Sequence, residues 1–207
     1  MGADDLDSAL DVLDAVASEA IWLGTEAGFD RQSRAADWER SLGDGSVRFL
    51  VVVDPADGRM LGHGRVHLAR YGVAEIGMLL AEEVRGRGVG RRLLDALVDA
   101  ARELGAHKVE LQVWPHNTAA IRLYQSHGFV VEGRIRSHYR RASGQLWDAI
   151  LMGLLLDPDL ADGSQGSGLA DAPCLPRSIE IAGGRAASGV GDAAEPAQAQ
   201  AVGDDEH

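Results

Sequence analysis

The sequence predicts an α/β fold in which helices pack against a mixed β-sheet. Two observations support this prediction. Segments whose apolar residues recur every three or four positions alternate with short runs rich in Val, Ile and Leu that are bounded by turn residues. The resulting order is helix, three strands, helix, strand, helix and two strands, which is typical of layered α/β proteins.

The N-terminal part is predicted to begin with a helix over residues 4–20. Aspartates at its start suit the positive end of the helix dipole. Its apolar residues recur at helical spacing: Leu6, Leu10, Leu13, Val16, Ala17 and Ala20. A second segment, at about 31–41, is predicted to be helical or irregular.

Three strands are predicted next. Residues 47–53 indicate a buried strand, and the sequence Asp-Pro-Ala-Asp-Gly at 54–58 indicates the turn of a hairpin. The returning strand covers residues 60–68. A third strand is predicted at 73–80.

The second long helix is predicted to begin among three alternating glycines, Gly86, Gly88 and Gly90. Glycine lets an anion approach the backbone N–H groups, and the positive end of the helix attracts it. Four arginines add charge at the same point: Arg85, Arg87, Arg91 and Arg92. The helix is indicated by an apolar stripe of Val89, Leu93, Leu94, Leu97, Val98, Ala101 and Leu104. A merely solvated helix start is the alternative, but it needs no glycines, which cost helix stability. The pattern therefore predicts a phosphate-binding cradle.

Two better-known phosphate motifs do not fit this pattern. A P-loop requires Lys-Ser/Thr after its last glycine, and neither follows Gly90. A dinucleotide fingerprint requires the spacing Gly-x-Gly-x-x-Gly directly after a strand. Glu110 lies at about the right distance to imitate a ribose ligand, but it falls inside a predicted strand, so this alternative is weak.

The remaining elements complete the predicted domain. They are a strand at 108–113, a short helix at 117–127 ended by Gly128, and two strands near 130–139 and 146–156. We therefore expect one domain over residues 1–156.

Composition limits the function. The chain has 207 residues and a net charge of −12. Much of this charge lies in residues 157–207, a segment of Gly, Ala, Ser, Asp and Pro that is predicted to be a disordered acidic tail. The remaining domain is only mildly acidic, with a local anion site rather than a nucleic-acid surface. No membrane helix or secretory signal is indicated, so we expect a cytoplasmic protein. The single cysteine, Cys174, and the spacing of the histidines predict no metal site.

Two motifs resemble the GNAT superfamily of acetyl-coenzyme A dependent N-acetyltransferases. The first is Arg/Gln-x-x-Gly-x-Gly/Ala, which opens a helix after a strand and stands here as R-G-R-G-V-G at 85–90. The second is Asn117, followed seven residues later by Tyr124 and then by Gly-Phe at 128–129. The similarity covers residues 4–156. The ending L-W-D-A-I-L-M-G-L-L-L resembles the branch that acetylates small amines or amino acids.

The resemblance implies how acetyl-CoA is bound. In a mostly antiparallel sheet, the strands at 73–80 and 108–113 splay apart to admit the thioester. The pantetheine arm pairs with backbone groups near Met78 and Leu80. The pyrophosphate binds to backbone N–H groups in the cradle, which comprises Arg85, Gly86, Arg87, Gly88, Val89, Gly90 and Arg91.

In one respect the chain departs from the family pattern. Most members have a strand before the first helix, whereas only residues 1–3 precede it here. Either the natural start lies further upstream or the strand at 47–53 is a sheet edge.

The chemistry requires a base and an acid. An attacking α-amine titrates near about 7.7 to 8.0, so it must lose a proton. Glu75 resembles the strand glutamate that serves as the base in several family members, directly or through water; a solvated glutamate is the alternative. Tyr124 stands in the family position for protonating the leaving thiolate, with a packing role as the alternative. Asn117 is expected to hold the coenzyme or cap its helix. A backbone N–H near Leu80 is expected to bind the oxyanion.

These inferences predict an N-acetyltransferase that moves an acetyl group from acetyl-CoA to a primary amine of a small molecule, such as an amino acid, by direct attack in a ternary complex. The alternatives are a protein N-terminal or lysine acetyltransferase and a non-catalytic acyl-CoA-binding module. Residues from the segments that border the acceptor pocket in the family are candidates for lining it: Trp22, Glu26, Arg136, Tyr139 and Asp148. His116, next to Asn117, is a candidate for contacting substrate or coenzyme, with an exposed loop histidine as the alternative. Dimers are common in the resembling family, so a homodimer is a further expectation.

Overall fold

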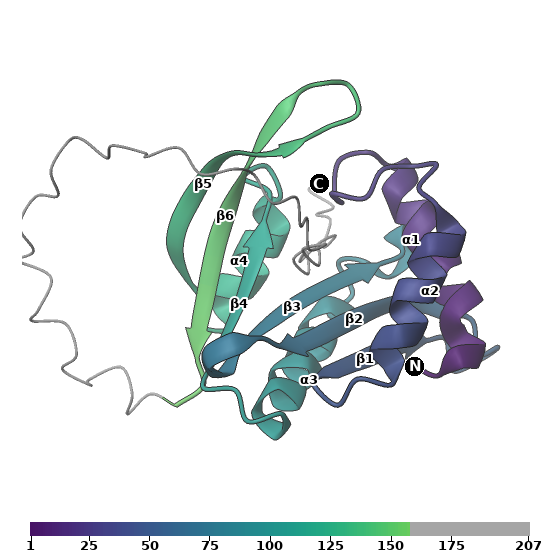
Figure 1. The fold of residues 1–207 in the computed structure, drawn as a ribbon, viewed down its shortest axis with the longest axis horizontal. Helices are drawn as coiled ribbons and strands as arrows, with labels where there is room; N and C mark the ends of the chain where they lie inside the picture. Colours follow the sequence, from purple (N-terminus) through teal and green to yellow (C-terminus); the bar gives the residue numbers. More distant parts are fainter. Residues whose placement is uncertain (158–207) are drawn as a thin grey trace, which may run out of the picture.

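A six-stranded mixed sheet organises residues 1–157, the part of the chain that the computed structural model describes (Figure 1). The strands are β1 (Val47–Val53), β2 (Met60–Leu68), β3 (Val73–Leu80), β4 (Lys108–Val113), β5 (Val130–Arg140) and β6 (Leu146–Leu155). Their order is β1-β2-β3-β4-β6-β5, and all neighbours are antiparallel except β3 and β4. The predicted fold class is confirmed. The tail predicted at 157–207 falls, apart from its first residue, outside the described residues.

Helices cover both faces of the sheet (Figure 1). Helices α1 (Leu6–Ser18) and α2 (Arg31–Leu42) pack on one face, and α3 (Val89–Glu103) and α4 (Thr118–Ser126) pack on the other. The segment predicted to be helical or irregular is therefore a helix, and Asp30 caps it by accepting a hydrogen bond from the Ser33 N–H at 2.9 Å. Three short 3-10 helices were not predicted: η1 (Ala3–Asp5), η2 (Arg70–Gly72) and η3 (Glu82–Val84).

Because successive side chains of each strand point to opposite faces of the sheet, the hydrophobic core consists of two clusters. Val66 and Ile76 point to α3 and pack with Leu97, while Phe49 and Leu79 point to the α1 and α2 side. Gly64 lets α3 approach the sheet, since a Cβ there would lie 2.8 Å from a Leu97 methyl carbon. We call the first side the α3/α4 face and the second the α1/α2 face.

The parallel strands β3 and β4 pair only at their first residues. The register holds for Val73 with Lys108, Ala74 with Val109 and Glu75 with Glu110, and then the strands diverge. Figure 1 shows the two arrows diverging beyond these residues, and we call the region between their unpaired backbones the opening. The predicted splayed pair is present.

The strand β1 lies at one edge of the sheet, as the departure from the family pattern led us to expect. The Met1 amino group lies beside it, 3.4 Å from the carbonyl oxygen of Phe49. Within residues 1–157, no helix is long and apolar enough to cross a membrane.

Candidate functional site

The backbone of β3 directs polar groups into the opening. The Ala81 N–H donates to Leu61 O at 2.8 Å, on the β2 side. Since N–H groups alternate along an antiparallel strand, those of Met78 and Leu80 point to the other side, where β4 has diverged. An extended ligand arm can therefore pair with β3 in place of β4.

A glycine turn follows this opening and leads into α3. Gly86 and Gly88 have positive φ angles of 69° and 77°, and Gly88 is the N-cap of the helix. No side chain of the described residues caps α3 at this end, and a Cβ added at either glycine would meet no atom within 4 Å. The N–H groups at the start of α3 thus face an accessible surface, which fits the binding of a phosphate.

The side chain of Arg85 does not contribute to this cradle as the sequence suggested. Its guanidinium is 7% exposed and forms two hydrogen bonds to the Glu19 carboxylate, at 2.7 and 2.5 Å. Its Nε donates to Leu80 O at 3.0 Å. The positive charge of Arg85 is therefore compensated within the protein, whereas Arg87 lies on the exposed turn.

Tyr124 and Asn117 each bury a polar atom that has no partner among the described residues. Tyr124 is fully buried in the core cluster that also contains Met78 and Val113, and its hydroxyl forms no hydrogen bond. Burial raises the pKa of this phenol above its usual value. The Asn117 Oδ1 caps α4 by accepting from the Ala120 N–H at 3.1 Å, which leaves Nδ2 unpaired. Unpaired buried polar atoms in native proteins call for an explanation such as a ligand or a catalytic role.

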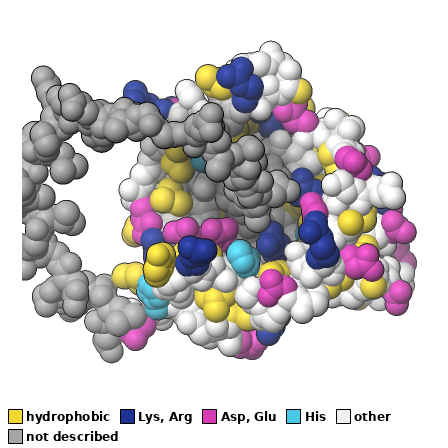
Figure 2. Space-filling view, in the orientation of Figure 1, with side chains coloured by type: hydrophobic (Ala, Val, Ile, Leu, Met, Phe, Trp, Pro, Cys, Tyr) yellow, Lys and Arg dark blue, Asp and Glu magenta, His cyan; other side chains and the backbone are white. Residues whose placement is uncertain are grey.

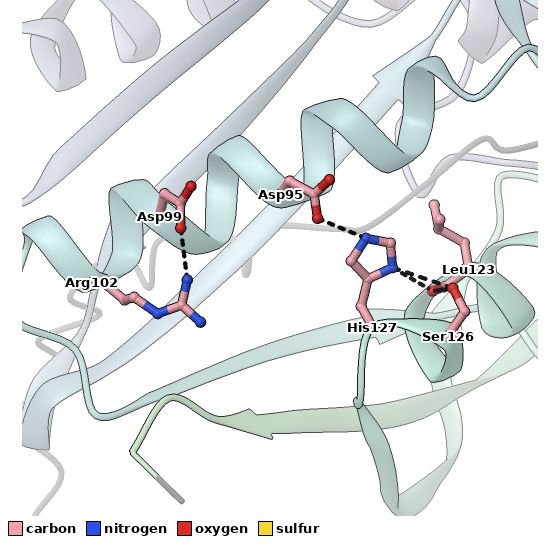
Figure 3. A network of polar contacts seen from close by, with 6 residues as sticks. All are labelled: Asp95, Asp99, Arg102, Leu123, Ser126 and His127. Carbon is pink, nitrogen blue, oxygen red and sulfur yellow. Dashed lines mark hydrogen bonds and ion pairs between the residues drawn. The ribbon is translucent and has the colours of Figure 1, made fainter.

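A histidine fixes α4 to α3 and so positions Tyr124 relative to the cradle. The His127 Nε2 lies 3.0 Å from the Asp95 carboxylate on α3, and Nδ1 lies 2.9 Å from Leu123 O at the end of α4 (Figure 3). The contact holds the helix that carries Tyr124 against the helix that begins with the glycine turn.

Glu75 lies at the closed end of the opening, on the α1/α2 face. Its neighbours Ala74 and Ile76 point into the opposite core, so the carboxylate shares its face with Glu110, its partner on β4. Glu110 and Glu132 are both in contact with Lys108, at 3.6 and 2.7 Å, whereas no described residue forms an ion pair with Glu75. Figure 2 shows acidic and basic side chains side by side across the lower part of this face.

The spacing along β3 separates Glu75 from Leu80. Five residues at about 3.3 Å each place them about 16 Å apart, too far for both to act on one carbonyl carbon. Met78 is two residues nearer, and its N–H also faces the opening. The Met78 N–H is therefore the candidate nearer to Glu75, while the expectation that a backbone group near Leu80 binds the oxyanion stays a prediction.

The loop between α1 and α2 forms a wall opposite β4, held by side chains from three other segments. We call residues 19–26 the wall loop. Its carbonyl oxygens accept hydrogen bonds from Arg141 at Leu23 (2.7 Å) and from Trp114 at Trp22 (2.9 Å). Trp147 packs on Arg141, with its ring 4.4 Å from the guanidinium carbon. The loop is thus ordered by contacts rather than by secondary structure.

The residues expected to contact the acceptor have mixed surroundings. The Glu26 carboxylate accepts from the Ala142 N–H at 2.8 Å, and Asp148 accepts from Arg134 at 2.7 Å, so both fix the β5–β6 hairpin. Tyr139 donates to Gln112 on β4 at 3.0 Å, and the His116 Nε2 lies 2.8 Å from Ile21 O. Trp22 and Arg136 also lie in these two segments. The candidates are brought to one side of the sheet, but most hold the wall loop and hairpin together.

Three residues of this region were missed from the sequence. Glu19 and Arg141 were not singled out, because nothing local marks a side chain that pairs far along the chain. Arg65 could have been noticed, since it is a charged residue in the middle of the strand predicted at 60–68, most of which is buried in the structure.

The geometry agrees with comparisons to known proteins. A model of the Acetyltransferase (GNAT) family matches residues 13–129. The chain is 30% identical over 164 residues to the L-methionine sulfoximine/L-methionine sulfone acetyltransferase of Pseudomonas aeruginosa, which covers 76% of this chain and 92% of that protein. The ribosomal-protein-alanine N-acetyltransferase from Brucella melitensis has a TM-score of 0.68 at 25% identity, over 75% of this chain and 97% of that one. A phosphinothricin acetyltransferase from Sinorhizobium meliloti in complex with AcCoA has a TM-score of 0.66 at 21% identity, over 75% and 85%.

The chain therefore belongs to the GNAT acetyltransferase family, as its two motifs indicated. It is an enzyme of the N-acetyltransferase class. Among residues 1–157, no group of three or more His, Cys, Asp and Glu side chains is arranged to hold a metal ion.

Proposed function

We propose that this protein transfers the acetyl group of acetyl-CoA to the primary amine of a small molecule such as a free amino acid, by direct attack in a ternary complex. The observation that carries the proposal is the combination of an open glycine turn at Gly86 and Gly88, an edge of β3 that β4 leaves unpaired, and a buried Tyr124 hydroxyl without a hydrogen-bond partner within residues 1–157. Acetyl-CoA would supply the thioester. The protein supplies binding groups and sites for the proton.

The cofactor fits the polar atoms on the α3/α4 face. The pyrophosphate would bind at the N–H groups of residues 86–91, which neither a side chain nor a Cβ obstructs. The pantetheine would pair with the edge of β3 at Met78 and Leu80. Asn117 Nδ2, which is not used in capping, is available to hold the coenzyme arm.

Tyr124 would donate its proton to the departing thiolate. Its pKa is raised by burial, so the phenol stays protonated at neutral pH and is a donor rather than a base. The hydroxyl makes no competing hydrogen bond within the described residues. Tyr124 is therefore the catalytic acid of the proposal.

Glu75 would accept the proton of the attacking amine through a water molecule. Glu75 and Met78 are separated by about 10 Å along the strand, which a glutamate side chain does not span alone. With the Met78 N–H bound to the developing oxyanion, one water bridges the remaining distance. Glu75 has no ion-pair partner among the described residues that would compete for the proton.

The acceptor distinguishes the enzymatic alternatives. The Pseudomonas relative acts on amino-acid derivatives, and the Brucella structure is named for acetylating the alanine of a ribosomal protein. Hydrogen bonds from Arg141 fix the wall loop against the β5–β6 hairpin. We favour a small amine because a loop held in this way limits the size of the acceptor that can bind beside it.

Thiol release tests the function. Acetyl-CoA is incubated with a panel of amino acids, aliphatic amines and short peptides, and free CoA is measured. We expect release with amino acids and little with peptides or lysine side chains. Faster turnover with peptides would support the protein acetyltransferase, and tight acetyl-CoA binding in a melting assay without release for any acceptor would support a non-catalytic module.

A further inference from the structure

Arg65 is a charged side chain on the α1/α2 face that forms no ion pair or hydrogen bond through its guanidinium with another residue of 1–157. It lies in the middle of β2, opposite Phe49 on β1 and Gly77 on β3. Its Nε is fully buried and forms no hydrogen bond with any described residue. Arg85 and Arg141 have guanidinium groups that are hydrogen-bonded by the wall loop, whereas Arg65 has no such acceptor among the described residues.

The electrostatics of this position favour an anionic ligand. Burial lowers the pKa of Arg65, while nearby Glu75 and the more weakly acting Asp44 partly oppose this and Arg34 adds to it. No carboxylate within residues 1–157 forms an ion pair with Arg65, although Glu75 is close enough to interact with its charge. A partly buried guanidinium without a partner is costly unless an anion binds it, and carboxylates match its planar donors.

The residue opposite Arg65 on β3 is Gly77, which lies between Arg65 and the strand edge that borders the opening. Gly77 carries no side chain on this face, and the next residue is Met78, whose N–H faces the splay. Glu75 lies two residues before Gly77 and points to the same face. Arg65 and Glu75 therefore lie on one face of neighbouring strands, diagonal to each other, with Gly77 next to both.

This arrangement has the charge pattern of an α-amino acid. A cation and a proton acceptor lie on either side of one glycine, and an α-amino acid carries a carboxylate and an amine on a single carbon. We propose that Arg65 binds the carboxylate of the acceptor and thereby directs the α-amine toward Glu75 and the thioester. The proposal rests on the proposed function and narrows its substrate to amines with an adjacent free carboxylate.

The test compares L-methionine with L-methioninamide, which differ in the carboxylate. The variants are Arg65→Met, which keeps the length without the charge, and Arg65→Lys. Arg102→Met, at the exposed end of α3, is the matched control because within residues 1–157 this arginine forms an ion pair with Asp99 alone. The readout is the ratio of kcat/KM for the acid to that for the amide, compared between enzymes so that amine basicity cancels.

We expect the Arg65→Met variant to lower this ratio about 10- to 100-fold, the usual effect of losing a charge-assisted hydrogen bond. The rate with the amide should stay within about twofold, and Arg65→Lys should give an intermediate ratio. Equal losses with both substrates, or an unchanged ratio, would overturn the proposal.

A binding measurement separates this proposal from the proposed function. N-acetyl-L-methionine, a product analogue with the carboxylate, is titrated into the wild type and Arg65→Met by calorimetry. If no amine is acetylated but the wild type binds the analogue at least 10 times more tightly than the variant, the proposed function fails and the carboxylate site stands. If the affinities are equal, the carboxylate site is refuted whatever the turnover.

Discussion

The two faces of the sheet supply the site with different kinds of groups. On the α3/α4 face, the binding groups are backbone N–H groups at Gly86 to Arg91 and along β3, with the Tyr124 hydroxyl below them. On the α1/α2 face, side chains from distant segments meet: Arg85 with Glu19, and Arg141 with the wall loop. The groups on the α3/α4 face are therefore positioned by the local backbone conformation, and those on the α1/α2 face by contacts between segments that are distant in sequence.

This difference has a consequence for substrate recognition. A backbone cradle binds any diphosphate that fits the turn, so it suits a cofactor common to a family. Side chains on a loop can change without disturbing the sheet, so they suit an acceptor that differs among relatives. Substitutions on the two faces should therefore separate effects on acetyl-CoA from effects on the amine.

The largest expected effect is on the α3/α4 face, at Tyr124. Tyr124→Phe removes the proposed acid, so kcat should fall about 100-fold or more. The free energy of unfolding should not decrease, because the lost hydroxyl has no hydrogen-bond partner. Steady-state kinetics and urea unfolding measure both, with Tyr71→Phe, at a side chain that is 90% exposed, as the control. Unchanged turnover would mean that the tyrosine only packs.

A buried histidine on the α1/α2 face should produce a pH effect on stability without a role in the reaction. Burial lowers the pKa of His63 to about 4, against a weaker backbone hydrogen bond at Ala9 that raises it. The unfolded chain, with a pKa near 6.5, therefore binds the proton first. The stability from keeping His63 neutral is complete above about pH 7 and lost as the pH falls toward 4, by about 3 kcal/mol.

Urea unfolding at pH 7 and pH 4.5 tests this assignment. The His63→Gln variant should show a smaller loss between the two pH values than the wild type, whereas exposed His138→Gln should match the wild type. An identical loss in His63→Gln and wild type would place the titration elsewhere.

Breaking the ion pair between Arg85 and Glu19 tests whether Arg85 contributes to the acetyl-CoA cradle or to the acceptor side of the site. Glu19→Gln leaves a buried guanidinium with a weaker partner, so the free energy of unfolding should fall by about 2 kcal/mol. The KM for the acceptor should rise about 5- to 10-fold as the wall loop loosens, and the KM for acetyl-CoA should change less than about twofold. Asp99→Asn, at an exposed pair, is the control. A larger change for acetyl-CoA would assign Arg85 to the cradle.

A substitution in the glycine turn should have the smallest effect on stability, but it should separate the roles of the two faces most clearly. Gly88→Ala places a side chain at a φ of 77°, which costs about 1–2 kcal/mol of stability, and Gly144→Ala does the same at 84° in the β5–β6 turn. Both should be destabilised alike. Only Gly88→Ala should raise the KM for acetyl-CoA, by about 10-fold. Equal KM values in the two variants would exclude the cradle as the cofactor site.

The elements and the cradle could be predicted because their signals are local. The apolar stripe from Val89 to Leu104 gives α3, the three alternating glycines give the turn before it, and Asn117 caps α4 as expected. The splay of β3 and β4 was expected from the family resemblance, since no local pattern in the strands encodes it.

By itself, the sequence determined the order of helices and strands, the family and the backbone cradle, because these depend on periodicity and on the conformational freedom of neighbouring residues. Only the tertiary structure decided that Arg85 binds Glu19, 66 residues away, that Arg141 holds Leu23 across 118 residues, and that the Arg65 Nε has no hydrogen-bond partner within residues 1–157. Such pairings depend on which faces pack together and on how much charge is buried there, and neither is set by spacing along the chain.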